Sequence, residues 1–288
     1  MDAIPLGTEY TSQEARAKGA TRRQILQDGV EVSRGLYLSS AVAPTLVARC
    51  RAWARLIPPD AAFGLETAAA LLGAPVTAPE EVQIVLRPRP VLPQRRGLSV
   101  HVRQLLTEDV VAKDGLRLAS PAQLFLDMAA RLPPHELMAV GDHLMRTGEL
   151  SRTDLTRRLE RADRVRGVAR ARELAPLLDP RARSRPESVI RYWLLASDLP
   201  DPEVDVPIVD RWGREVAHAD LGYSRWKVAV EYEGRQHAEP EQFGRDIERY
   251  SLMAADGWLT LRFAGRHLGG PWTVVERTRR ALLNRGWQ

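Results

Sequence analysis

The sequence predicts an α+β protein built from several domains. Segments in which apolar residues recur with helical spacing alternate with short, valine-rich segments that have strand spacing. The chain has 288 residues, more than a single hydrophobic core usually spans. Its hydrophobic content of 44% and charged content of 27% are those of an ordinary globular protein.

Composition and charge narrow the functional classes. No apolar run approaches the roughly 20 residues that a membrane span needs, and the first residues lack the pattern of a secretory signal. Together with the heavy use of arginine, alanine and leucine, this predicts a cytoplasmic bacterial protein with no membrane partner. Cys50 is the only cysteine, which excludes an internal disulfide and a multi-cysteine zinc site. The net charge of +5 favours a polyanionic partner such as DNA.

Residues 1–42 are predicted to fold as a winged helix-turn-helix. Thr11 or Ser12 can cap a first short helical segment and Thr21 a second, and a hairpin over 30–38 follows as the wing. The alternative is a small packing domain with scattered surface arginines. The candidate DNA-binding residues are Arg22 and Arg23 at the start of the second helix and Arg34 in the wing.

Residues 43–177 are predicted to form an α+β domain that ends in a basic helical linker. Helices are expected over 46–56, 61–72, 121–131 and 134–145, and strands over 82–86 and 98–102. The segment between the two strands is proline-rich and is either a DNA-contacting loop or an ordinary hairpin connection. Its candidate DNA-binding residues are Arg87, Arg89, Arg95 and Arg96.

The linker over 146–172 carries the excess charge. It holds nine arginines and four acids, a difference of +5 that equals the net charge of the chain. This segment could form an electrostatic track for DNA. The alternative is a solubilising helix laced with ion pairs between side chains of the same helix.

Residues 178–288 are predicted to fold in the order αβββαβα. The first helix begins at Ser184, with Glu187 placed as the acid of a capping box. Further strands are expected over 204–209, 215–221, 227–233 and 258–263, and further helices over 241–255 and 271–285.

Two acids share one face of the strand over 227–233. Glu231 and Glu233 point to the same side because strand side chains alternate. If the preceding strand pairs with this one, Asp220 comes close to them. Two carboxylates about 4 Å apart repel by roughly 4 kcal/mol at an effective dielectric near 20. The cluster should therefore be open to water or hold a cation, and Mg²⁺ (or Mn²⁺) is the simplest candidate.

The same region resembles the Vsr-type (very-short-patch-repair-like) branch of the PD-(D/E)XK nuclease superfamily. The resemblance implies a restriction-endonuclease-like fold over about residues 180–288, with Glu187 as a third acid that reaches the metal from the first helix. Glu233 stands where the superfamily has lysine, which puts more weight on His237 as the base. The residues that carry the resemblance are Asp220, Glu231-Tyr232-Glu233-Gly234, His237, Arg245-Asp246, Arg249, Gly257-Trp258 and Arg262.

A second resemblance covers the N-terminal and middle regions. The stretches EARAKGATRRQI, from Glu14, and RGLY, from Arg34, resemble the N-terminal domain of AbiEi-type antitoxins. The pattern of residues 44–177 fits the middle part of the same family. This resemblance implies a DNA-binding regulator.

These features predict a Mg²⁺-dependent DNA endonuclease, targeted by an N-terminal DNA-binding module and acting in repair or defence. The alternative is an antitoxin-type DNA-binding transcriptional regulator whose nuclease fold is catalytically degenerate. A third reading is an RNase of a defence module. The predicted roles are catalysis by Asp220, Glu231, Glu233, His237 and Glu187, metal binding by Asp220, Glu231 and Glu187, and DNA binding by Arg245, Arg249 and Arg262.

Overall fold

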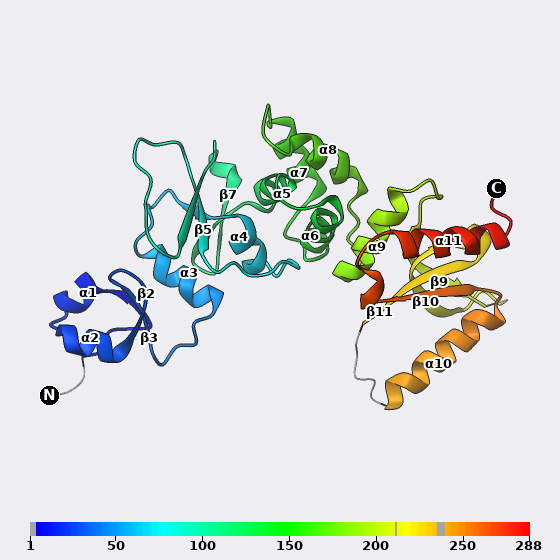
Figure 1. Ribbon diagram of the computed structural model, residues 1–288, viewed down its shortest axis with the longest axis horizontal. Helices are drawn as coiled ribbons and strands as arrows, with labels where there is room; N and C mark the ends of the chain where they lie inside the picture. Colours follow the sequence, from blue (N-terminus) through cyan, green and yellow to red (C-terminus); the bar gives the residue numbers. More distant parts are fainter. Residues whose placement is uncertain (1–3, 211, 235–239) are drawn as a thin grey trace. The chain divides into compact units, whose positions relative to one another are not determined.

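A computed structural model describes residues 4–210, 212–234 and 240–288, with residues 240–243, 245 and 246 as backbone alone (Figure 1). These residues form eleven α-helices and three β-sheets, so the α+β class is confirmed. Backbone contacts divide the chain into a first unit, Met1–Ala130 with Thr153–Val168, and a second unit, Arg131–Arg152 with Ala169–Gln288. These units do not coincide with the predicted domains 1–42, 43–177 and 178–288, which stay a prediction.

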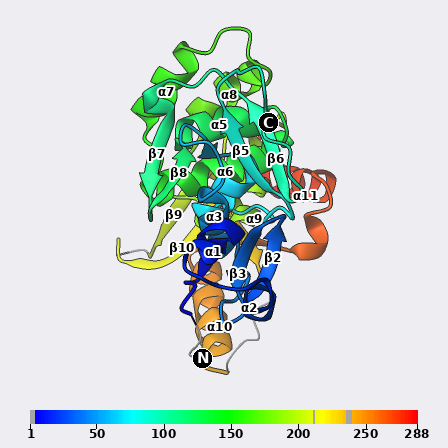
Figure 2. The same cartoon turned by 90° about the vertical axis from the view of Figure 1, so that its left-hand side faces the viewer.

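The first unit begins with two short helices and a small antiparallel sheet. The sheet has the order β1-β3-β2, and Figure 2 shows β2 and β3 side by side. Tyr10, Ala15, Ile25 and Tyr37 are buried in its core. The elements are β1 (Glu9–Thr11), α1 (Ser12–Ala17), α2 (Arg22–Asp28), β2 (Gly29–Ser33) and β3 (Leu36–Ser39). Helices and hairpin thus lie where the sequence predicts them, while their identity as a winged helix-turn-helix stays a prediction.

The structure selects Thr11 over Ser12 as the cap of α1 and confirms Thr21 as the cap of α2. The Thr11 hydroxyl accepts a hydrogen bond from the Glu14 amide at 3.1 Å, and the Glu14 carboxylate accepts one from the Thr11 amide at 2.7 Å. Thr21 and Gln24 form the same reciprocal pair at α2. Glu14 also binds the guanidinium of Arg55, at the end of α3, which lowers the pKa of its carboxyl to about 2. One carboxylate therefore caps α1 and ties it to α3.

A five-stranded mixed sheet follows in the first unit. Its order is β6-β5-β4-β8-β7, and most of its central strands are buried. The elements are α3 (Leu46–Ala54), β4 (Ala62–Phe63), α4 (Leu65–Leu71), β5 (Val82–Leu86), β6 (Leu98–Val102), β7 (Val110–Lys113), β8 (Leu116–Ala119) and α5 (Pro121–Ala129).

The arginine-rich segment between β5 and β6 is no hairpin connection. The two strands pair in parallel, with Val82 opposite Leu98 and Leu86 opposite Val102. A parallel pair requires the connection to return along the whole strand, whereas a hairpin turn reverses direction at once. The hairpin alternative is therefore wrong, and the segment 87–97 is a crossover without a helix of its own.

The structure differs from the prediction in three short strands. The predicted helix over 61–72 is strand β4 followed by α4, with Gly64 between them. A Cβ at Gly64 would lie 2.6 Å from a methyl group of Val85, so only glycine fits this close approach of β4 to β5. Strands β7 and β8 were not predicted, because segments of four residues show too little alternation.

The basic linker contains helices α7 (Arg152–Glu160) and α8 (Val168–Leu174). In the first unit, Arg158 and Arg161 reach the buried Asp109 at 3.3 and 2.8 Å. In the second unit, Arg146, Arg152 and Arg170 donate to backbone carbonyls. At least five of the nine linker arginines are thus engaged within the protein, and the DNA track loses those five. Their partners lie outside the linker, so these five do not form the ion pairs within one helix that the alternative expects, whereas Arg157 lies 4.0 Å from Asp154 within α7.

The second unit contains a four-stranded sheet of order β12-β11-β10-β9. Strand β10 pairs antiparallel with β9 on one side and with β11 on the other. Strand β12 then joins β11 in parallel after a crossover helix. The predicted order of elements is present. The elements are α6 (Pro134–Arg146), α9 (Arg185–Leu195), β9 (Glu203–Val209), β10 (Glu215–Tyr223), β11 (Val228–Glu233), α10 (Pro240–Ala255), β12 (Leu259–Ala264) and α11 (Trp272–Asn284).

The two faces of this sheet pack against different helices. Val228 and Val230 of β11 join the core that contains residues of α9 and α11, whereas Ala229 joins a smaller core with Met253 of α10. In Figure 1, α10 accordingly lies on the side of the sheet away from α11. The predicted alternation of β11 is confirmed, and it places Glu231 and Glu233 on the α10 side.

A buried ion pair joins α6 to α9. Both carboxylate oxygens of Asp142 accept hydrogen bonds from Arg191, at 2.8 and 2.7 Å, and the two side chains are 1% and 4% exposed. Asp142 also accepts from the amide of Asp179 at 2.8 Å. The pair therefore fixes α9 and the chain before it.

None of the helices over 4–210, 212–234 and 240–288 is long and apolar enough to cross a membrane.

Asp142→Ala should lower the free energy of unfolding by about 3–5 kcal/mol, because it leaves the Arg191 guanidinium buried without its counter-ion. Replacing both partners at once, as Asp142→Leu with Arg191→Met, should recover most of this loss. The measurement is urea-induced unfolding of the full chain followed by circular dichroism. Asp198→Ala breaks an exposed ion pair of the same kind with Arg279 and serves as the control. A loss at Asp142→Ala no larger than at the control would contradict the prediction.

Candidate functional site

Asp220 lies where strands β10 and β11 separate. Their ladder ends at the pair Leu221–Val230. Beyond it, the Asp220 carboxylate accepts the amide hydrogen of Tyr232 at 3.0 Å and so takes the place of a strand partner. Burial raises the pKa of Asp220.

Glu231 is buried beside Asp220. Glu231 is 2% exposed, and its Oε2 atom lies 2.9 Å from the guanidinium group of Arg249 and 2.7 Å from the Tyr250 hydroxyl. Among the described residues, Oε1 has no hydrogen-bond partner. Burial raises the pKa of Glu231, and the charges of Asp220 and Glu233 act in the same direction. The neighbouring acids predicted from the sequence are therefore electrostatically coupled.

A single hydroxyl joins the two acids of β11. Tyr250 lies 2.7 Å from Oε2 of Glu231 and 2.7 Å from Oε1 of Glu233, and it accepts from Arg249 at 2.8 Å. Its one proton can be donated to only one of the two carboxylates at a time. Burial works to raise the pKa of Glu233, but Tyr250 and Arg262 outweigh it and the pKa is lowered. The pKa values of the two acids of β11 are therefore shifted in opposite directions, up for Glu231 and down for Glu233.

Guanidinium groups provide the cations that the clustered acids require. Arg262 forms an ion pair with Glu233, and Arg249 forms one with Glu231. Both guanidinium groups lie over the ring of Tyr250, 4.3 and 4.8 Å from its centre. In this arrangement Arg249 and Arg262, which the sequence suggested as phosphate ligands, bind carboxylates. Their contact with DNA stays a prediction.

Glu187 is placed by its helix cap. Its carboxylate accepts from the Arg183 amide and from the Ser184 hydroxyl, both at 2.7 Å. Ser184 caps α9 as predicted, but the carboxylate reaches the amide before that of Ser184 and so does not complete the predicted capping box. Burial and then the charge of Asp220 raise its pKa, which shows that the two carboxylates interact. In the parts of the chain that the structure describes, no three His, Cys, Asp or Glu side chains are grouped so that they could hold a metal ion.

Two predicted site residues are not placed by the structure. His237 lies outside the described residues, and Arg245 is described by its backbone alone, in α10. Their roles as base and as phosphate ligand stay predictions.

The predicted DNA-contacting arginines of the first unit are mostly exposed. Arg22 and Arg23 lie in the first turn of α2, and Arg34 lies at the turn between β2 and β3. Arg95 donates to the carbonyl of Arg34 at 3.0 Å, so the crossover segment borders this turn. Arg89 is engaged in an ion pair with Asp60, and the remaining exposed members of the crossover are Arg87 and Arg96. The structure therefore brings together two segments that the sequence treated separately.

Tyr250 is the residue that the sequence reading missed. It follows Arg249 in an amphipathic helix, where an aromatic side chain is read as part of the core. Nothing in the local pattern shows that its hydroxyl lies between two acids of β11.

Comparison with known proteins identifies relatives of this chain. Residues 60–177 match the family described as the AbiEi antitoxin C-terminal domain. The chain is similar to the uncharacterized proteins MT2308 and Rv2248 of two Mycobacterium tuberculosis strains, each 30% identical over 233 residues, which are 80% of this chain and 83% of the relative. The crystal structure of RV2827C protein from Mycobacterium tuberculosis is similar with a TM-score of 0.43 and 19% identity, over 64% of this chain and 75% of that chain.

Tyr250→Phe should lower the free energy of unfolding by roughly 1–3 kcal/mol, because it removes a hydrogen-bond partner from the buried carboxylate of Glu231. Urea-induced unfolding at neutral pH measures the change. Tyr232→Phe, which removes a hydroxyl from the opposite face of β11, is the matched control and should have a smaller effect. Equal losses for the two variants would show that the bridge between Glu231 and Glu233 contributes nothing.

Proposed function

The chain belongs to the same protein family as MT2308 and Rv2248, and we propose from this premise that it is a DNA-binding regulator of the antitoxin type. The observation that carries the proposal is the match of residues 60–177 to the AbiEi antitoxin C-terminal domain. This match favours the antitoxin-type regulator, which the sequence left open as the alternative, rather than the endonuclease.

The first unit offers a surface for the phosphate backbone. The first turn of α2 and the turn at Arg34 present exposed arginines, and the crossover segment adds Arg95 and Arg96 beside that turn. Among the described residues, no acid forms an ion pair with any of these arginines, so their guanidinium groups are available to phosphates. We define the wing surface as Arg22, Arg23, Arg34, Arg95 and Arg96.

The acidic cluster of the second unit fits a regulator better than a hydrolase. A metal ligand must be deprotonated, whereas burial raises the pKa of Glu231. Arg249 and Arg262 already neutralise the carboxylates. A catalytically degenerate site with a structural role is therefore the simpler proposal.

Removing arginines from the wing surface should weaken DNA binding and flatten its salt dependence. For Arg23→Ala and Arg34→Ala, we expect the log–log slope of affinity against salt to fall by about 0.9 per lost phosphate contact. Fluorescence anisotropy of a labelled duplex at several salt concentrations measures both effects.

The control for this experiment is Arg280→Ala, which removes one exposed positive charge from α11. Its affinity and salt slope should remain close to those of the unaltered protein. If the wing variants behave like this control, the DNA-binding surface lies elsewhere. If the unaltered chain binds no duplex even at low salt, the regulator proposal fails.

Metal-dependent DNA hydrolysis is a second candidate function. One observation favours it: Oε1 of Glu231 is buried without a partner among the described residues, next to Asp220. Asp220 and Glu231 would hold a Mg²⁺ or Mn²⁺ ion, which would polarise a phosphodiester and activate a water. Both carboxyl groups would have to be deprotonated to bind the ion.

A plasmid-nicking assay with Mg²⁺ or Mn²⁺ separates the two candidate functions. The regulator proposal expects no cleavage by the unaltered chain, on DNA or on RNA. Cleavage that disappears in Asp220→Ala and in Glu231→Ala would establish the hydrolase and refute degeneracy of the site. Cleavage that persists in both variants would indicate a contaminating nuclease and leave these two acids without a catalytic role.

A further inference from the structure

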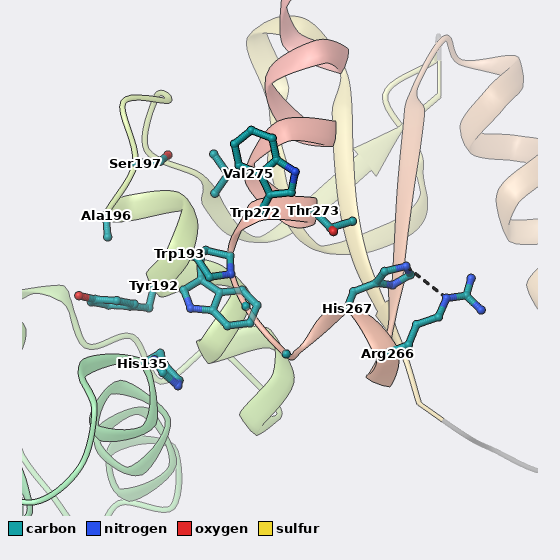
Figure 3. A pocket seen from close by; sticks show the side chains of 13 residues that line it. His135, Tyr192, Trp193, Ala196, Ser197, Arg266, His267, Trp272, Thr273 and Val275 are labelled. Carbon is teal, nitrogen blue, oxygen red and sulfur yellow. Dashed lines mark hydrogen bonds between the residues drawn. The ribbon is translucent and has the colours of Figure 1, made fainter.

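A pocket of about 780 Å³ opens in the second unit between the end of α9 and the start of α11. Its size lies in the range of small-molecule sites, roughly 300–1,000 Å³. Figure 3 shows Tyr192, Trp193 and His135 on one side and the pair Arg266–His267 on the other. It lies apart from the acidic cluster, because none of its lining residues is Asp or Glu.

One wall of the pocket is aromatic. The ring of His135 lies 5.8 Å from that of Trp193 and 6.3 Å from that of Tyr192, centre to centre. Trp193 is 6% exposed, so this wall is rigidly packed. Trp272, at the first position of α11, is 77% exposed and borders the same pocket. An exposed tryptophan at the rim of an apolar pocket is well placed to stack on a planar ring.

The opposite wall holds a guanidinium group beside an imidazole. Nδ1 of His267 lies 2.9 Å from the amide nitrogen of Ala264, and the Nε atom of Arg266 donates toward Nε2 of His267 at 3.3 Å (Figure 3). A neutral imidazole accepts at one nitrogen, so these two contacts compete. When Nδ1 accepts from Ala264, Nε2 carries the hydrogen, and an anionic oxygen placed beside it would accept from both His267 and Arg266.

The start of α11 adds further donors to the same pocket. The helix has 13 residues, and no side chain caps its N-terminus. It is preceded by Gly269 and Gly270, whose absent Cβ atoms would have met no atom within 4 Å. The first-turn amides of a helix favour an anion, because they are unpaired and lie at the positive end of the helix dipole. The pocket is therefore complementary to negative charge, because these amides and Arg266 border it and no carboxylate is among its lining residues.

We propose that this pocket binds a nucleotide, with the base stacked against Trp272 and the phosphate held by Arg266, His267 and the start of α11. The same chemistry is present in a free mononucleotide and at the phosphorylated end of a DNA strand. The proposal is independent of the wing surface, because it rests on residues of the second unit alone.

Isothermal titration of the full chain with AMP, adenosine and inorganic phosphate tests the proposal. AMP should bind more tightly than either part alone, since it engages both walls. Arg266→Gln should weaken AMP about tenfold or more and leave adenosine nearly unchanged, whereas Trp272→Ala should weaken both by about fivefold or more, because the base loses its stacking partner. Trp272→Phe should restore most of the binding.

Matched controls are available in the same unit. Arg280→Gln removes an equal charge from α11, and Trp212→Ala removes another exposed tryptophan; both should bind AMP as the unaltered chain does. The proposal is overturned if AMP gives no saturable heat, or if the controls lose as much affinity as the pocket variants. If a 5′-phosphorylated oligonucleotide competes better than AMP, the occupant is a strand end; if it competes worse, the occupant is the free nucleotide.

Discussion

The fold depends on buried carboxylates that are held by arginine. Asp109, Asp127, Asp142 and Glu231 are each at most 2% exposed, and each is in contact with at least one guanidinium group. A buried carboxylate without such a partner would cost several kcal/mol. Arginine suits this task because its planar fork can bind both carboxylate oxygens and remains charged when buried. The chain has three lysines and therefore 39 arginines among its 42 basic residues, which matches this use.

This constraint limits what charge counting can reveal. The excess of +5 in the linker suggested a DNA track, but Arg158 and Arg161 are directed at Asp109, which lies about 50 residues earlier in the chain. Sequence spacing identifies ion pairs within one helix and cannot identify partners in distant segments. The same limit applies to Arg249 and Arg262, whose carboxylate partners lie on a neighbouring strand.

Local signals in the sequence were sufficient for most elements. The caps at Thr11, Thr21 and Ser184 and the alternation of β11 follow from interactions within a few residues, and the structure confirms them. The short strand β4 and the parallel pairing of β5 with β6 depend on distant partners and could not be derived. For the candidate site, the proximity of Asp220 to Glu231 was predictable from strand pairing. The position of the Tyr250 hydroxyl between Glu231 and Glu233 was not.

The double attachment of Glu14 has a consequence for how the N-terminal region can be studied alone. Its carboxylate caps α1 and also binds Arg55, a residue that lies beyond the predicted 1–42 domain. A fragment that stops at residue 42 would keep the cap and release the carboxylate from its cation. The pKa of Glu14 would then move up toward that of a free side chain. The isolated piece would consequently tolerate acid less well than the same residues do within the intact chain.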